Sequence, residues 1–178
     1  YQIQAITTDG AGPTATTDRL VMGPALTVPY RCNFATDDQF ALWNVIDANN
    51  DKYTWKRETT LAAAYYYYNE DGETGGDDWL VSSPIHLEKD KIYRLKFKLQ
   101  SYDVGYPEKV AVHLGTGASV AEQTTLLGDY EIESNTFVEY KVILPEKLES
   151  GNYHISFHCH SEPYMFILYV TDVLLEEV

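Results

Sequence analysis

The sequence predicts an all-β protein, a jelly-roll β-sandwich preceded by a short β-hairpin. Three observations support this fold class: apolar and polar residues alternate over many short segments, turn-forming residues separate these segments, and only one short stretch favours a helix. The chain has 178 residues, of which 44% are hydrophobic, so it can bury a core. No run approaches the roughly 20 apolar residues that a membrane-spanning helix needs, so we expect no membrane insertion.

The clearest strand lies at 92–100, where apolar residues alternate with Arg and Lys. Residues 165–175 are apolar on both faces, which predicts a central strand of a sheet. A single helical turn is expected at Asp37–Leu42, with Asp37 as its N-cap. Further strands are expected at 110–114, 138–144 and 153–159.

Residues 1–28 have a different organisation from the rest of the chain. An alternating strand at 1–6, a turn at Gly10–Pro13 and a second strand at 15–22 predict a hairpin. This segment resembles the last two strands of a fibronectin type III domain. A remnant of that size cannot form its own core, so we expect it to pack on the main domain, residues 29–178.

The net charge of −14 argues against binding to nucleic acid, which depends on clustered Lys and Arg. It also disfavours attachment to an anionic membrane surface. A soluble surface protein, or one whose carboxylates gather calcium, fits this charge.

The chain has two cysteines, Cys32 and Cys159, and they show no spacing typical of a zinc or redox motif. Two interpretations stay open. They form a disulfide between the first and last strands of an exported protein, or they are two buried free thiols.

Four segments of the main domain carry a family resemblance: 29–34 (PYRCNF), 45–55 (VIDANNDKYTW), 77–85 (DDWLVSSPI) and 169–176 (YVTDVLLE). In order and spacing they resemble the cleaved-adhesin family, the jelly-roll modules of gingipain-type haemagglutinins, which are related to MAM and galactose-binding domains. The resemblance implies a non-catalytic module of a secreted or cell-surface bacterial protein. It implies a glycan or a host surface or matrix protein as the partner, although fold alone does not settle function.

Fifteen tyrosines supply candidate ligand-binding side chains. Aromatic rings with a polar tip suit stacking on a sugar, and the run at 65–68 must place rings on both faces of a sheet. The alternative is ordinary aromatic packing under loops, and we assign Trp55 and Trp79 mainly to the core. The candidates for stacking are Tyr66, Tyr102, Tyr106 and Tyr164.

Calcium could bind in either of two places. Asp47, Asn49 and Asp51 alternate as in calcium loops, although Lys52 stands where an EF-hand needs glycine, and the alternative is a solvated turn. The resemblance to jelly-roll modules implies a second, composite calcium site where the first and last strands meet. Its candidate ligands come from three separate segments: Asp37 or Asp38, Asp77 or Asp78, and Asp172.

Other chemistry has weaker support. His154, His158 and His160 share one strand face. They either bind a transition metal or belong to an exposed face without function. Glu131 and Glu133 share a strand face at a spacing that a glycosidase could use, but no fuller catalytic motif surrounds them. A passive spacer in a modular surface protein is the remaining alternative to a binding module.

Overall fold

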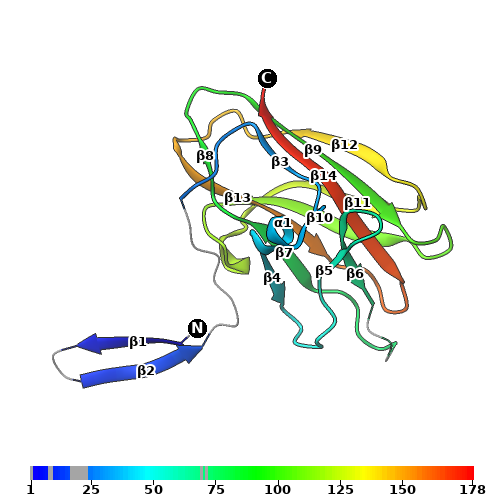
Figure 1. Ribbon diagram of the computed structural model, residues 1–178, viewed down its shortest axis with the longest axis horizontal. Coiled ribbons are helices and arrows are strands. Elements are labelled where there is room, and N and C mark those ends of the chain that lie inside the picture. Colours follow the sequence, from blue (N-terminus) through cyan, green and yellow to red (C-terminus); the bar gives the residue numbers. More distant parts are fainter. Residues whose placement is uncertain (1, 8–9, 17–23, 69, 71) are drawn as a thin grey trace.

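The computed structural model describes residues 2–7, 10–16, 24–68, 70 and 72–178, and it confirms the all-β sandwich (Figure 1). Every strand pair is antiparallel, as expected for short strands joined by tight turns. The first strands are β1 (Gln2–Thr7), β2 (Gly10–Thr16), β3 (Tyr30–Cys32), β4 (Trp43–Asp47), β5 (Lys56–Glu58), β6 (Ala63–Tyr67) and β7 (Asp78–Ser82). The later strands are β8 (Ile85–Leu87), β9 (Tyr93–Ser101), β10 (Glu108–Gly115), β11 (Thr125–Ile132), β12 (Val138–Ile143), β13 (Gly151–Cys159) and β14 (Ile167–Glu177).

Two six-stranded sheets form the sandwich. We call sheet I the one with strand order β11-β10-β13-β7-β4, in which β8 also pairs with β13. Sheet II has the order β12-β9-β14-β6-β5, and β3 also pairs with β14. The predicted central strand is β14, which lies between β9 on one side and β6 and β3 on the other.

The core lies between the two sheets and draws side chains from both. In β9 every second residue, from Tyr93 to Leu99, is buried, as the alternating sequence predicts. The largest side chains that are almost fully buried are Trp43, Trp55, Tyr66, Phe34, Phe97 and Phe157.

The predicted helical turn is α1 (Asp37–Ala41), but its N-cap is Thr36 and not Asp37. The backbone N–H of Gln39 donates to the Thr36 hydroxyl at 3.2 Å, which satisfies one of the free donors at the helix start. Asp37 is already helical, and its carboxylate pairs with Arg57 at 2.6 Å. The capping prediction was therefore wrong by one residue.

The predicted N-terminal hairpin is present, because β1 and β2 pair in a two-stranded sheet of their own. Its likeness to fibronectin type III, the packing of its side chains and the domain division at residue 28 stay predictions. Leu26, just before that division, forms a parallel bridge with Ile85 of sheet I. Among the described residues, no helix is long and apolar enough to cross a membrane.

Candidate functional site

Five aromatic residues gather where several strands of sheet II end, and we call them the Phe166 cluster. Phe166 precedes β14, Tyr67 ends β6 and Tyr68 follows it, and Tyr102 and Tyr106 stand in the loop between β9 and β10. The ring centroids of Tyr102 and Phe166 lie 4.7 Å apart in an edge-to-face arrangement, and those of Tyr106 and Phe166 lie 6.1 Å apart. Tyr67 and Tyr68 contact Phe166 at 5.6 and 5.5 Å. Such contacts hold aromatic rings in defined positions.

Backbone hydrogen bonds fix the loop that carries Tyr102 and Tyr106. The Tyr102 N–H donates to Ile167 O at 2.9 Å, and the Tyr106 N–H donates to Asp103 O at 3.1 Å. The Asp103 carboxylate accepts from the Gly105 N–H at 2.8 Å, which closes an Asx turn. Tyr102 and Tyr106 are nevertheless 52% and 47% exposed, so the loop presents two positioned rings to solvent.

Tyr164 lies close to this cluster along the chain and is 62% exposed. Its ring covers Gly72, where a side-chain Cβ would meet the ring at 2.0 Å. Gly72 has a φ of +70°, so both its conformation and its close approach to the ring favour glycine. The structure thus places Tyr102, Tyr106 and Tyr164 on the loops at one end of the sandwich.

Tyr66 corrects our prediction. Its side chain is 1% exposed and packs between the sheets against Trp55, with ring centroids 6.3 Å apart. A ring in this position cannot stack on an external sugar. Tyr65 and Tyr67, its neighbours in β6, occupy the outward positions instead.

Sequence reasoning missed Phe166, which organises the cluster. The residue stands near the start of the apolar run 165–175, which predicts a strand residue. The sequence feature that could have indicated a loop position is the nearby Glu162-Pro163, because proline favours a turn.

The expected calcium loop is folded as a set of turns. Asp47 accepts backbone N–H groups of Asp51 and Lys52 at 3.2 and 2.9 Å, and Asp51 accepts from Tyr53 at 2.8 Å. Asn49 accepts from the Asp51 N–H and donates its amide to Gly75 O at 3.0 Å. Most of the oxygens that would bind a cation therefore hold the loop together.

Asp78 lies against this loop. It is the cross-strand partner of Asp47, so the two side chains share a sheet face. Asp78 is fully buried, and its Oδ1 atom makes no hydrogen bond within the described chain. Burial, with the nearby Asp47 and Asp51 carboxylates, raises the pKa of Asp78 to about 7. Across the described residues, however, no three His, Cys, Asp or Glu side chains are gathered as in a metal site.

The composite calcium set does not come together. Asp77 and Asp78 belong to sheet I, whereas Asp172 belongs to β14 of sheet II. Asp172 pairs with Lys98 at 2.8 Å on the outer face, and Asp77 pairs with His158 at 2.8 Å. Asp38, next to the paired Asp37, is exposed. The acid within the apolar strand is thus explained by its exit to solvent and its ion pair with Lys98.

His154 and His158 of β13, and His160 just after it, have separate partners on sheet I. His154 contacts Ser82 O at 2.7 Å, and His160 pairs with Asp129 at 2.8 Å. His158 stacks on Trp79 with ring centroids 4.0 Å apart and an interplanar angle of 8°. Trp79 is thus buried, as our assignment to the core predicts, but it lies beneath a histidine on the outer side of sheet I and outside the main core cluster.

Glu131 and Glu133 are both exposed, and Ile132 between them is buried. Glu131 lines a shallow pocket of about 330 Å³ together with Lys109, Asp129 and His160, but Glu133 does not. The pair is not brought to a common cleft there.

Cys32 and Cys159 are both buried and free, so the disulfide interpretation is wrong in this structure. Burial raises the pKa of the Cys159 thiol well above its usual value, which favours the unreactive protonated form.

No family model matches the chain, and no curated protein matches it either. Solved structures show what the fold is similar to. The K1 cleaved adhesin domain of Lys-gingipain from Porphyromonas gingivalis superposes with a TM-score of 0.67 at 20% identity, over 84% of this chain and 98% of that domain. The K3 cleaved adhesin domain of the same protein gives 0.64 at 19% identity, over 83% and 96%. A xylan-binding domain from Paenibacillus barcinonensis gives 0.54 at 10% identity, over 84% and 99%. The chain thus has the β-sandwich fold that cleaved adhesin domains share with carbohydrate-binding modules, as its sequence predicts.

Proposed function

We propose that this protein is a non-catalytic module that binds glycan chains outside the cell, and that Tyr102 and Tyr106 of the Phe166 cluster form the contact surface. The observation that carries this proposal is a pair of half-exposed rings whose positions are fixed by Phe166 and an Asx turn. A rigid aromatic surface loses little entropy when a sugar ring stacks on it. The cleaved adhesin and xylan-binding domains with the same fold support an adhesive, carbohydrate-binding role.

A glycan array followed by calorimetry tests this function, with host matrix proteins included as alternative partners. Each of Tyr102→Ala and Tyr106→Ala should weaken binding about fivefold, because one stacked ring contributes roughly 1 kcal/mol. Tyr102→Phe is the matched control, since it keeps the ring and should keep most of the affinity. A folded protein that binds no glycan would leave the spacer role as the better explanation.

For the loop around Asp47 and Asp51 we propose a structural calcium ion next to Asp78. The support is the buried Oδ1 atom of Asp78, which accepts no hydrogen bond from the described residues, beside the Asp47 and Asp51 carboxylates. Binding would require Asp47 and Asp51 to exchange backbone hydrogen bonds for the cation. Calcium should then raise the melting temperature relative to a chelator, because a ligand of the folded state stabilises it. Asp78→Asn should abolish that increase, and equal melting temperatures in both buffers would contradict the proposal.

A further inference from the structure

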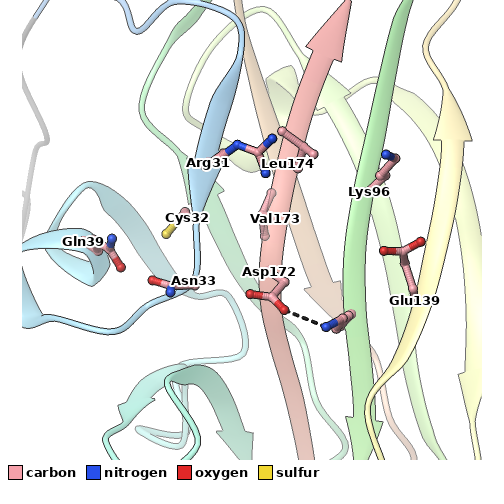
Figure 2. A pocket seen from close by; sticks show the side chains of 10 residues that line it. Arg31, Cys32, Asn33, Gln39, Lys96, Glu139, Asp172, Val173 and Leu174 are labelled. Carbon is pink, nitrogen blue, oxygen red and sulfur yellow. Dashed lines mark ion pairs between the residues drawn. The ribbon is translucent and has the colours of Figure 1, made fainter. Parts of the chain in front are cut away.

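A groove of about 450 Å³ opens on the outer face of sheet II (Figure 2), and none of its lining residues belongs to the Phe166 cluster. Asp172, Val173 and Leu174 of β14 line its middle. Residues of β3 and α1 line one side, and the basic side chains of β9 line the other. We call it the β14 groove.

A β-bulge in β14 creates this groove. Thr171 pairs with Lys98 of β9 and Leu174 pairs with Lys96, so Asp172 and Val173 together oppose a single residue of β9. On the other side, β14 pairs with β6 up to Val170 and with β3 only from Val173 onward. Asp172 therefore lies in the gap between β6 and β3.

The β3 and α1 side of the groove presents hydrogen-bond donors. The side-chain oxygens of Asn33 and Gln39 both accept from the Ala35 N–H, at 3.2 and 2.8 Å. This fixes the orientation of both amides and leaves their NH₂ groups as the free ends. The exposed Arg31 guanidinium lines the same groove and forms no ion pair within the described chain. A ligand that meets this wall must supply acceptors.

The charge of this face is opposite to that of the whole protein. On β3, β9, β12 and β14, five basic side chains point outward with only three acidic ones, although the chain has a net charge of −14. Each acid is matched by a lysine or arginine: Asp172 with Lys98, Glu176 with Arg94 and Lys96, and Glu139 with Lys141. Among the described residues, Arg31 is left as the cation of this face without an ion-pair partner.

Aromatic rings continue the same face along β14. Tyr169 points outward between Tyr65 and Phe137, with ring centroids 6.3 and 6.4 Å away. From Tyr169 to Leu174 the strand spans about 16 Å at the usual rise per residue, which suits an extended oligosaccharide better than a single sugar.

We propose that the β14 groove binds an acidic oligosaccharide, with a carboxylate or sulfate held by Arg31 and the amide groups of Asn33 and Gln39, and with its chain lying along β14. This inference rests on the proposed glycan-binding function. Arginine suits the role because its planar guanidinium matches both anions with two parallel hydrogen bonds.

Calorimetry with tetragalacturonate, and with the same tetrasaccharide after reduction of its carboxylates, tests the proposal. The acidic form should bind at least about tenfold more tightly, because hydrogen bonds to a charged group contribute more than neutral ones. Its affinity should fall with added salt, while that of the reduced form should not. A chondroitin 4-sulfate tetrasaccharide and its desulfated form distinguish sulfate from carboxylate as the preferred anion. Equal binding of each acidic sugar and its neutral form would overturn the inference.

Two variants locate the site. Arg31→Gln should remove the preference for the acidic sugars, while Lys147→Gln, the same charge change on an exposed residue outside the groove, should not. Gln39→Glu keeps an oxygen for the Ala35 N–H but replaces the donor with a negative charge, so it should weaken acidic sugars about tenfold or more.

Tyr102→Ala separates the two proposals, since it should affect the reduced and acidic tetrasaccharides alike. Neutral binding that depends on Tyr102, with no effect of Arg31→Gln on acidic binding, would overturn the groove and leave the proposed function standing. Absence of any glycan binding would overturn both.

Discussion

Glu108 is a buried acid beneath the loop end of the sandwich. Its side chain is fully buried, Ser161 donates to its Oε2 atom at 2.5 Å, and its Oε1 atom lacks a partner within the described chain. Burial raises the pKa of Glu108 to about 7, and the Ser161 hydrogen bond only partly opposes this effect. The folded protein therefore holds a proton on Glu108 at a pH where the unfolded chain has released it.

This carboxyl should make stability fall as the pH rises. Between the unfolded value near 4.5 and the folded value near 7 the native state binds more protons, so the free energy of unfolding decreases up to pH 7 and is flat above it. Glu108→Gln keeps the shape of the side chain without the charge. Its free energy of unfolding should therefore rise relative to that of the wild type by about 3 kcal/mol as the pH increases from 5 to 8. Urea denaturation across this range measures the difference. Glu133→Gln, at an exposed position, should follow the wild-type profile, and a Glu108→Gln profile parallel to wild type would contradict the prediction.

At the level of single residues, the sequence pattern predicts which side chains are buried only where polar and apolar residues alternate along a strand. In β9 the pattern assigns every residue correctly. Four consecutive tyrosines at 65–68 show no alternation, so the sequence pattern does not tell which of them points inward, and the inward position of Tyr66 depends on its packing against Trp55. The exposed Tyr102 and Tyr106 were predictable because loop signals surround them, whereas Phe166 was not.

At the level of elements, the bulge in β14 is the feature that the sequence could not reveal. Asp172 has a φ of +51°, which lets Thr171 and Asp172 point outward while Val173 and Leu175 point into the core. An acid in an apolar run indicates an irregularity, but its nature depends on the register against β9. The strands themselves follow from local alternation and turn residues.

Deletion of Asp172 should therefore straighten β14 without turning its core residues outward. Without the extra residue, Val173 would lie opposite Phe97 with its side chain still inward, and Leu174 would stay opposite Lys96, so the deletion should cost no more than about 3 kcal/mol. Asp172→Gly keeps the bulge and relieves the left-handed conformation, which offsets the loss of the exposed ion pair with Lys98 to within about 1 kcal/mol. Urea denaturation of both variants measures these changes. A loss of more than about 4 kcal/mol in the deletion variant would contradict the prediction, because it would show that Val173 and Leu175 had left the core.

At the level of the whole molecule, the limits of the folding unit decide which fragment can be studied alone. The sequence places the boundary at residue 28, but the structure attaches the preceding segment to sheet I. The Leu26 N–H donates to Pro84 O at 2.7 Å, and its carbonyl accepts from the His86 N–H at 2.8 Å. The Leu26 side chain also packs against the core.

A fragment of residues 24–178 should accordingly be more stable than one of residues 29–178. Two lost backbone hydrogen bonds and the partial exposure of core around Leu26 should together cost about 2 to 3 kcal/mol. Thermal and urea denaturation of the two fragments measure this difference. Leu26→Ala in the longer fragment should lose about half of this stability difference, because the two backbone hydrogen bonds of Leu26 remain. If the two fragments unfold together, the bridge between Leu26 and Ile85 adds nothing to the sandwich, and its folding unit begins at the predicted boundary.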